Sequence, residues 1–229
     1  DYNQISPNKL YKNLGDETFQ QIDLTDYIEN SNSFSAIPIY ANDDMYPDIY
    51  IANDFDQFNQ LLINLEGQGF VEMAVEYGVE DPFDGMGLTT CDFNNDLSLD
   101  FFVTNIKENS LYTKETSNSS FAYTNYSVEA NLYDTDWAWG VTFSDFNHDG
   151  FEDFYVANGF FNPENDRFFI NDSGNNFTYS DFSGNPPLMS KSRSVNSFDY
   201  DNDSDLDLIV TDFNLNVDLW ENRSVDTYF

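Results

Sequence analysis

The feature that most constrains this chain is an internal repeat with steps of 52, 53 and 54 residues. Four segments align without gaps over fourteen positions, and they begin at residues 40, 92, 145 and 199. Their sequences are YANDDMYPDIYIAN, DFNNDLSLDFFVTN, DFNHDGFEDFYVAN and DYDNDSDLDLIVTD. A second series of short segments, from LYKNLGDETF at 10–19 to LWENRS at 219–224, alternates with the first. Two interleaved series with one period indicate a repeat protein in which each repeat forms the same supersecondary unit.

Each repeat carries the pattern of four short β-strands. A segment such as GVTFS at 140–144 precedes the acidic stretch, and a run of aromatic and β-branched residues follows it, so both are predicted strands. SLYTKE at 110–115 predicts a third strand, and FAYTN at 121–125, after an Asn- and Ser-rich turn, predicts a fourth. The absence of a long helical period favours an all-β fold, a β-propeller of four-stranded antiparallel blades. A β-sandwich with accidental internal similarity is the alternative.

We expect one propeller region over residues 1–229. Its repeats are a partial blade at 1–33 and blades at 34–84, 85–136, 137–190 and 191–229. The sequence has four acidic loops but five hairpin segments, because residues 9–24 supply only the outer half of a blade. The sequence therefore predicts an arc of about four and a half blades that continues into further blades of a larger propeller in the parent chain.

Oxygen-bearing side chains recur at positions 1, 3, 5 and 9 of the acidic loops, counted from the first aligned residue. Alternate residues of a tight loop can converge on one point, and hard oxygen ligands suit Ca²⁺, with the position-7 carbonyl as a further ligand. The candidate metal ligands are Asn42, Asp44, Tyr46 and Asp48 in the first loop, Asp92, Asn94, Asp96, Ser98 and Asp100 in the second, Asp145, Asn147, Asp149, Phe151 and Asp153 in the third, and Asp199, Asp201, Asp203, Asp205 and Asp207 in the fourth. We therefore expect about three to four Ca²⁺ ions.

The charge balance favours a cation in these loops. The chain has 42 Asp and Glu residues against 8 Lys and Arg residues, which gives a formal net charge of -34. Clustered carboxylates without a cation would repel one another by kilocalories per mole at modest dielectric. The same charge repels phosphate backbones and anionic lipids, so we expect no nucleic-acid partner. No apolar run approaches the roughly 18 residues of a membrane span, so we expect no membrane insertion.

The four loops match this pattern unequally. Gly150 stands at position 6 of the third loop, where a positive φ is favoured, whereas Leu97 and Ser204 stand there in the second and fourth. The first loop departs most, because Tyr40 replaces the leading Asp and Met45 occupies position 6. Solvated Asp-rich turns without a metal are the alternative, and this alternative is strongest for the first loop.

Two other kinds of metal site are excluded by particular residues. An EF-hand requires a bidentate Glu at position 12 and helices on both sides of the loop. Position 12 is instead occupied by the aliphatic residues Ile51, Val103, Val156 and Val210, which fall in predicted strands. A zinc site needs several His or Cys ligands, and the chain has one of each.

The repeated motifs resemble those of a known family. The matching pieces are YPDIYIANDF at 46–55, DGMGL at 84–88, WAWGVTFSDFNHDGFEDFYVANG at 137–159, SRSVNSFDYDNDSDLDLIV at 192–210 and the LYKNLGDETF-type hairpins. They resemble FG-GAP/VCBS repeats, the calcium-loop blades also found in integrin α-subunit propellers. More narrowly, they are similar to the propeller of the cartilage acidic protein and ASPIC/UnbV-associated family. This resemblance implies a Ca²⁺-binding propeller, often seven-bladed, in secreted or cell-surface proteins.

Three residues outside the ligand set could suggest other chemistry. His148 is the only histidine, and no sequence motif supplies a nucleophile or an orienting group for it, so the sequence does not indicate catalysis. We expect Trp137 and Trp139 to pack between blades, and stacking on sugar rings is the alternative.

The sequence thus predicts a non-enzymatic, Ca²⁺-stabilised propeller that is secreted or lies at the cell surface. We expect it to act as an interaction or adhesion scaffold for an unknown protein or glycan ligand. The alternatives are a carbohydrate-binding propeller and a non-catalytic accessory region of a polysaccharide-degrading enzyme.

Overall fold

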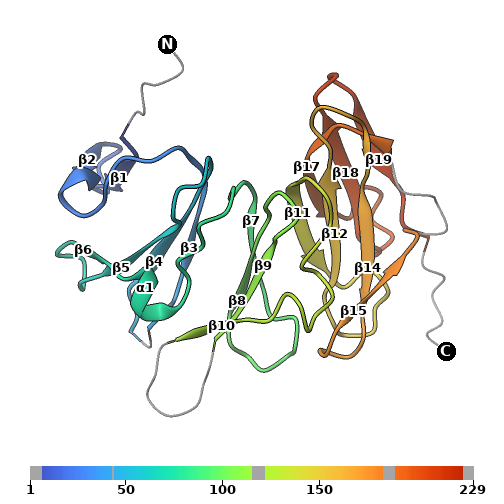
Figure 1. Cartoon of the computed structure of the whole chain (residues 1–229), viewed down its shortest axis with the longest axis horizontal. Helices are drawn as coiled ribbons and strands as arrows, with labels where there is room; N and C mark the ends of the chain where they lie inside the picture. The colour runs from blue at the N-terminus through green and yellow to red at the C-terminus, as the bar shows by residue number, and fades with distance from the viewer. Residues whose placement is uncertain (1–6, 43, 115–121, 183–188, 224–229) are drawn as a thin grey trace.

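The computed structural model describes residues 7–42, 44–114, 122–182 and 189–223, which form antiparallel sheets arranged along an arc (Figure 1). Three sheets have four strands and the last has three. We call them blade one, of β3 (Ser33–Ile39), β4 (Asp48–Asn53), β5 (Gln60–Asn64) and β6 (Phe70–Glu72); blade two, of β7 (Leu88–Cys91), β8 (Asp100–Val103), β9 (Ser110–Lys114) and β10 (Tyr123–Asn125); blade three, of β11 (Ala138–Ser144), β12 (Asp153–Asn158), β14 (Arg167–Asn171) and β15 (Phe177–Ser180); and blade four, of β17 (Ser192–Phe198), β18 (Asp207–Asp212) and β19 (Val217–Trp220).

A separate hairpin of β1 (Lys9–Asn13) and β2 (Phe19–Asp23) precedes blade one. It corresponds to the outer half of a blade, as the hairpin series predicted. The prediction of an all-β propeller with an arc of about four and a half blades is therefore confirmed.

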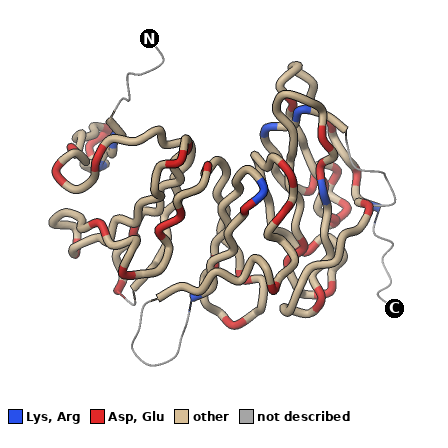
Figure 2. The backbone as a smooth tube through the Cα atoms, viewed as in Figure 1, with Lys and Arg blue, Asp and Glu red and all other residues tan. Residues whose placement is uncertain are grey.

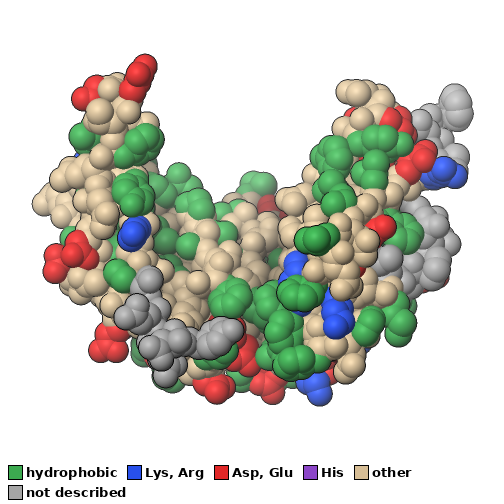
Figure 3. Space-filling view, turned by 90° about the horizontal axis from the view of Figure 1, so that it is seen from above, with side chains coloured by type: hydrophobic (Ala, Val, Ile, Leu, Met, Phe, Trp, Pro, Cys, Tyr) green, Lys and Arg blue, Asp and Glu red, His purple; other side chains and the backbone are tan. Residues whose placement is uncertain are grey.

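Neighbouring blades meet along their first strands. β3 lies beside β7, β7 beside β11, and β11 beside β17, while the outer strands of different blades are farther apart. The blades therefore fan out from their first strands, as in a propeller. Viewed from above, the arc is open and encloses a wide hollow (Figure 3).

Two glycines allow the first strands to approach closely. A Cβ atom on Gly87, just before β7, would lie 2.0 Å from the carbonyl oxygen of Trp139 in β11. A Cβ atom on Gly140 would lie 2.7 Å from the Cα atom of Ser194 in β17. Glycine is thus required at both positions because backbone occupies the space that a side chain would need.

Aromatic side chains fill the spaces between blades. Phe102 of blade two packs against Phe154 of blade three with tilted rings whose centroids are 4.8 Å apart, and Tyr50 of blade one packs in the same way against Phe101 of blade two at 4.6 Å. All four of these side chains are fully buried. Burial of such a ring contributes about 1.5–3 kcal/mol, so apolar contacts provide the main attraction between blades.

Short elements complete the chain. A 3₁₀ turn, η1 (Leu24–Asp26), follows the hairpin, and a one-turn helix, α1 (Ala74–Tyr77), follows blade one. A two-residue pair joins β13 (Glu164–Asn165) to β16 (Met189–Ser190). Acidic residues are spread along the whole backbone, and basic residues are sparse (Figure 2).

Candidate metal-binding loops

All four acidic segments connect the first strand of a blade to its second strand. We name them loop one (40–48), loop two (92–100), loop three (145–153) and loop four (199–207). Because the connection is the same in every blade, the four loops lie on the same face of the arc, one in each blade (Figure 1).

Loop three shows the turn that positions the candidate ligands. The Asp145 carboxylate accepts hydrogen bonds from the backbone N–H of Asp149 at 3.0 Å and of Gly150 at 2.9 Å. Asn147 accepts a second bond from the Asp149 N–H at 2.9 Å and donates its amide to the Asp149 carboxylate at 3.0 Å. Gly150 has a φ of +90°, as its place at position 6 predicted. These bonds gather positions 1, 3 and 5 on one side of the turn.

Loop two forms the same turn with a less suitable residue at position 6. Asp92 accepts from the backbone N–H groups of Asp96 at 3.0 Å and Leu97 at 3.1 Å. Leu97 adopts a φ of +66°, and its side chain is 94% exposed. A left-handed conformation costs a non-glycine residue about 1–2 kcal/mol. Leu97 is therefore a strained position in this loop.

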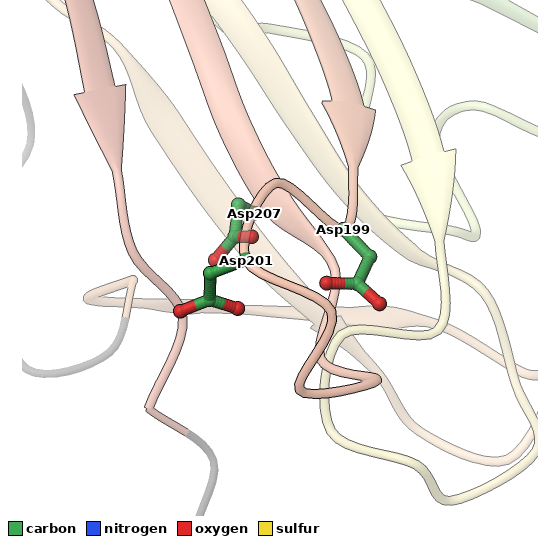
Figure 4. A group of neighbouring side chains, drawn as sticks. All are labelled: Asp199, Asp201 and Asp207. Atoms are coloured by element: carbon green, nitrogen blue, oxygen red, sulfur yellow. The ribbon is translucent and has the colours of Figure 1, made fainter.

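Loop four brings three carboxylates together. Asp199, Asp201 and Asp207 each offer one oxygen, and these oxygens lie within 4.8 Å of one another (Figure 4). Within the described residues this is the one such group of three acidic, His or Cys side chains. The physical reason is that position 3 is an aspartate here, whereas Asn94 and Asn147 occupy it in loops two and three.

The pKa of one carboxyl group in loop four reflects this crowding of negative charges. The pKa of Asp201 is raised, first by partial desolvation and then by the negative charge of Asp203. A divalent cation would reverse this unfavourable interaction between carboxylates.

The ninth residue of each loop has a structural role that the sequence did not indicate. Asp153 is fully buried and accepts hydrogen bonds from the backbone N–H of Phe146 at 3.2 Å and of Asn171 at 3.0 Å. Asp207 accepts in the same way from Tyr200 and Asn222, at 3.0 and 2.8 Å. In loops three and four the ninth carboxylate therefore joins the start of its loop to the end of the third strand or to the segment just after it.

Loop two contains a carboxylate oxygen without a hydrogen-bond partner. Asp100 Oδ1 accepts from the Lys114 N–H at 3.2 Å, but Asp100 Oδ2 is buried and has no partner among the described residues. Burial raises the pKa of Asp100 to about 7, and the nearby charges of Asp96 and Asp92 add to the effect. An unpaired buried carboxylate oxygen is costly, and a bound cation would provide the missing interaction.

Loop one keeps part of the turn, but it lacks the leading carboxylate, and Met45 at position 6 does not have the positive φ of Leu97, Gly150 and Ser204. Asn42 accepts from the backbone N–H of Asp44 at 3.2 Å, and Asp44 accepts from that of Tyr46 at 2.7 Å. Asp48 is buried and accepts from Ala41 at 2.9 Å. Position 1 is a tyrosine, so no side-chain oxygen of this kind is placed there.

The residues at position 7 share one interaction in all four loops. Each donates its backbone N–H to the carboxylate at position 5, at distances of 2.7 to 2.9 Å; these residues are Tyr46, Ser98, Phe151 and Asp205. Their carbonyls remain predicted ligands.

Loops of adjacent blades also contact each other. Glu152 of loop three accepts the backbone N–H of Asp92 in loop two at 2.9 Å, and Asn95 of loop two donates to the carbonyl of Gly150 at 2.8 Å. His148 Nε2 lies 2.8 Å from a carboxylate oxygen of Asp205 in loop four. Sequence reasoning missed these contacts, because they depend on which loop lies beside which in the folded arc.

A second cluster of interest lies at the opposite end of β11. Trp137 and Trp139 are half-buried and pack on Phe160, with ring centroids 4.8 and 5.6 Å apart. The guanidinium of Arg193 from blade four lies 4.3 Å above the Trp139 ring, and Phe161 beside it is exposed. We call these five residues the aromatic platform. The tryptophans thus contribute to packing between blades, as favoured, while the platform remains partly open to solvent.

Within the described part of the chain, no helix is long and apolar enough to cross a membrane.

Comparison with known proteins identifies a repeat family. The family of FG-GAP-like repeats matches residues 92–156 and 145–210, which together span more than half of the chain. No curated protein matches the chain. Among solved structures, an Agrocybe aegerita lectin described as recognising non-reducing terminal N-acetylglucosamine is similar, with a TM-score of 0.51 at 12% sequence identity. The alignment covers 94% of this chain and 60% of the lectin, so the chain spans less than two thirds of that protein. At this identity the likeness concerns the fold alone.

Proposed function

From the premise that the chain belongs to the FG-GAP-like repeat family, we propose that it is a Ca²⁺-binding propeller. One observation carries the proposal: three carboxylate oxygens of loop four lie within 4.8 Å of one another. Three negative charges at this spacing repel strongly unless a cation lies among them. The buried, unpartnered oxygen of Asp100 is independent support from a second loop.

The donor set fits calcium. All candidate ligands are carboxylate, amide or carbonyl oxygens, which hard cations prefer, and the flexible turn suits the variable coordination of Ca²⁺. The residues that would hold the ions by their carboxylates are Asp92, Asp96 and Asp100 in loop two, Asp145, Asp149 and Asp153 in loop three, and Asp199, Asp201, Asp203 and Asp207 in loop four. Bound Ca²⁺ supplies the positive charge that offsets repulsion within each loop and couples metal binding to folding. We expect affinities on the order of 10⁻⁴ to 10⁻³ M per loop.

Terbium luminescence offers a direct test. Tb³⁺ replaces Ca²⁺ in oxygen sites and is excited by a nearby tyrosine, and Tyr200 stands at position 2 of loop four. We expect sensitised emission that Ca²⁺ competes away, and a loss of the loop-four component in Tyr200→Phe. Asp201→Asn should weaken the same component without changing Tyr200. Emission that is absent, or that Ca²⁺ does not displace, would contradict the proposal.

We further propose that the protein is a non-enzymatic scaffold for interaction or adhesion and that it works outside the cell. The support is that weak calcium loops are filled in a calcium-rich medium and that the loops are placed to brace blades. Labelling of intact cells and of the medium with an impermeant amine reagent would test the location. Labelling found only after lysis would count against it.

A second candidate function is carbohydrate binding. Two features favour it: the partly exposed rings of the aromatic platform, which suit stacking on sugars, and the lectin fold described above. Titration of tryptophan fluorescence with N-acetylglucosamine and a glycan array would test it. Trp139→Phe should remove a sugar-dependent change, whereas Trp220→Phe in β19 should keep it. An array without hits would exclude this candidate.

A further inference from the structure

The residue that ends the third strand of each blade links that blade to the preceding loop. In blades two and three this residue is Lys114 and Asn171, and in blade four the equivalent is Asn222, two residues after the end of β19. Its backbone N–H bonds to the ninth aspartate of its own blade, at 3.2, 3.0 and 2.8 Å respectively. The backbone of this residue therefore has the same place in each blade, and its side chain points toward the neighbouring blade.

In blades three and four the link is an uncharged amide. Asn171 donates to the carbonyl of Phe93 in loop two at 2.8 Å. Asn222 donates to the carbonyl of Phe146 in loop three, also at 2.8 Å. Both acceptors stand at position 2 of a loop that begins with aspartate.

In blade two the link is a cation. Lys114 Nζ donates to the carbonyl of Tyr40 at 3.2 Å, and Tyr40 is the first residue of loop one. The loop that lacks the leading aspartate is thus the loop that receives an ammonium group from the next blade. Loops two and three, which keep that aspartate, receive a neutral amide one residue later, at the carbonyl of position 2.

We propose that Lys114 is a built-in cation for loop one, so that this loop forms without a metal ion, whereas loops two, three and four each bind one. This inference rests on the proposed calcium function and specifies which loops carry it out. The ammonium group has three donors and a compact charge, and its flexible stem allows it to reach across the gap between blades.

The charges at the ligand positions support this division. Loop one has two carboxylates there, Asp44 and Asp48, against three in loop two, three in loop three and four in loop four. A monovalent group offsets a larger fraction of the charge in loop one than it would in the others. It also repels a divalent ion approaching the same loop.

The number of bound ions is the first test. Native mass spectrometry in calcium acetate should give three Ca²⁺ per chain for the wild type. The double substitution of Tyr40→Asp and Lys114→Asn restores the pattern of loops two and three in loop one, and it should raise the number to four. Four ions in the wild type, or three in the double variant, would contradict the role of Lys114. A wild type without bound Ca²⁺ would instead remove the proposed function.

Thermal unfolding in excess chelator tests the cation without calcium. Lys114→Met keeps the length of the side chain and removes the charge, and we expect it to lower Tm by about 2–4 °C. Lys107→Met, at an exposed lysine away from loop one, is the matched control and should change Tm by less than this. Equal Tm values for the two variants would overturn the inference, whatever the calcium stoichiometry.

Discussion

Loop one and loop four share part of a turn and differ in charge and at position 6, where Ser204 has a φ of +78° and Met45 is not among the residues with a positive φ. In both, position 7 donates its N–H to the aspartate at position 5, at 2.7 Å in loop one and 2.9 Å in loop four. In both, the ninth aspartate is buried and accepts two backbone N–H groups. Loop four adds Asp199 and Asp201, which meet Asp207 within 4.8 Å, whereas loop one has Tyr40 and Asn42 at the same positions.

This difference separates the formation of the loop from the binding of an ion. Side-chain bonds from Asp and Asn to the local backbone are enough to form the part of the turn from position 3 to position 7, since loop one has these bonds without the leading carboxylate. The additional carboxylates of loop four accept turn hydrogen bonds, Asp199 from Asn202 and Ser204 at 2.7 and 3.2 Å and Asp201 from Asp203 at 3.3 Å, but they also add a mutual repulsion that loop one does not have. A bound cation would offset this repulsion, and the predictions below test this distinction.

The largest effect is expected from removal of the ninth aspartate. Asp207→Ala and Asp48→Ala each leave one buried and one part-buried backbone N–H group without an acceptor, so each should lower the unfolding free energy by about 1–4 kcal/mol in chelator. In Ca²⁺, Asp207→Ala should lower the unfolding free energy by more than this, because an ion ligand is also removed. Asp48→Ala should lower the unfolding free energy by the same amount in Ca²⁺ as in chelator. Urea unfolding of both variants in the two buffers measures the difference. A calcium-dependent loss in Asp48→Ala would contradict the distinction between the loops.

The next effect concerns pH and compares an acid outside the loops with those inside. Asp166 is fully buried and accepts bonds from Tyr155, Asn158 and Ser192, and burial raises its pKa to about 7. The folded state therefore retains a proton that the unfolded state releases near pH 4. This contribution to stability is complete below about pH 4 and is lost as the pH rises toward 7, with a slope of up to about 1.4 kcal/mol per pH unit.

Asp166→Asn removes one titrating carboxyl, so the unfolding free energy should depend less steeply on pH. This change should be the same in Ca²⁺ and in chelator. Burial also raises the pKa of Asp153 in loop three to about 7, but an ion at that loop would lower it, so its part of the slope should disappear in Ca²⁺. Unfolding free energies between pH 4 and 7 check both statements. A slope unchanged in Asp166→Asn would show that this carboxyl is ionised throughout the range.

A smaller effect is expected from exchange of the third position. Asp201→Asn keeps the acceptor oxygen for the turn and removes one charge, so the calcium affinity of loop four should fall about tenfold, while stability in chelator should rise slightly because repulsion is relieved. The reciprocal Asn42→Asp in loop one should add no calcium site while Tyr40 and Lys114 remain. Calcium titrations followed by terbium competition distinguish the two loops. A new site in Asn42→Asp would mean that the third position alone decides binding.

The smallest effect concerns backbone strain at position 6. Leu97→Gly should relieve the left-handed conformation of loop two and stabilise the protein by about 1 kcal/mol, and Gly150→Ala should destabilise loop three by a similar amount. Neither side chain is a ligand, so both changes should be independent of calcium. Melting temperatures in chelator and in Ca²⁺ measure this. A gain in Leu97→Gly confined to Ca²⁺ would contradict strain as its cause.

Much of the fold could be predicted from the sequence because each repeat restates the same pattern. The aliphatic residues at position 12, such as Val156 and Val210, do lie in second strands, as predicted when an EF-hand was excluded. The strand expected at 140–144 is the end of β11. The pairing of β13 with β16 was not predictable, because two-residue strands have no periodicity to detect.

The candidate site was predictable only in part. Spacing identified the carboxylates at positions 1, 3, 5 and 9, and charge counting distinguished loop one from loop four. The sequence could not indicate that Glu152 bonds to loop two, or that Lys114 reaches loop one, since both contacts cross from one blade to another. Such contacts depend on the angle between sheets rather than on local pattern.

Thermal unfolding of the wild type in excess CaCl₂, MgCl₂ and chelator tests the central claim most directly, namely that the carboxylates added to the shared turn hold calcium. We expect a Tm in Ca²⁺ at least several degrees above that in chelator, with Mg²⁺ giving a smaller shift because it demands tighter octahedral geometry. The same Tm in all three solutions would contradict the account.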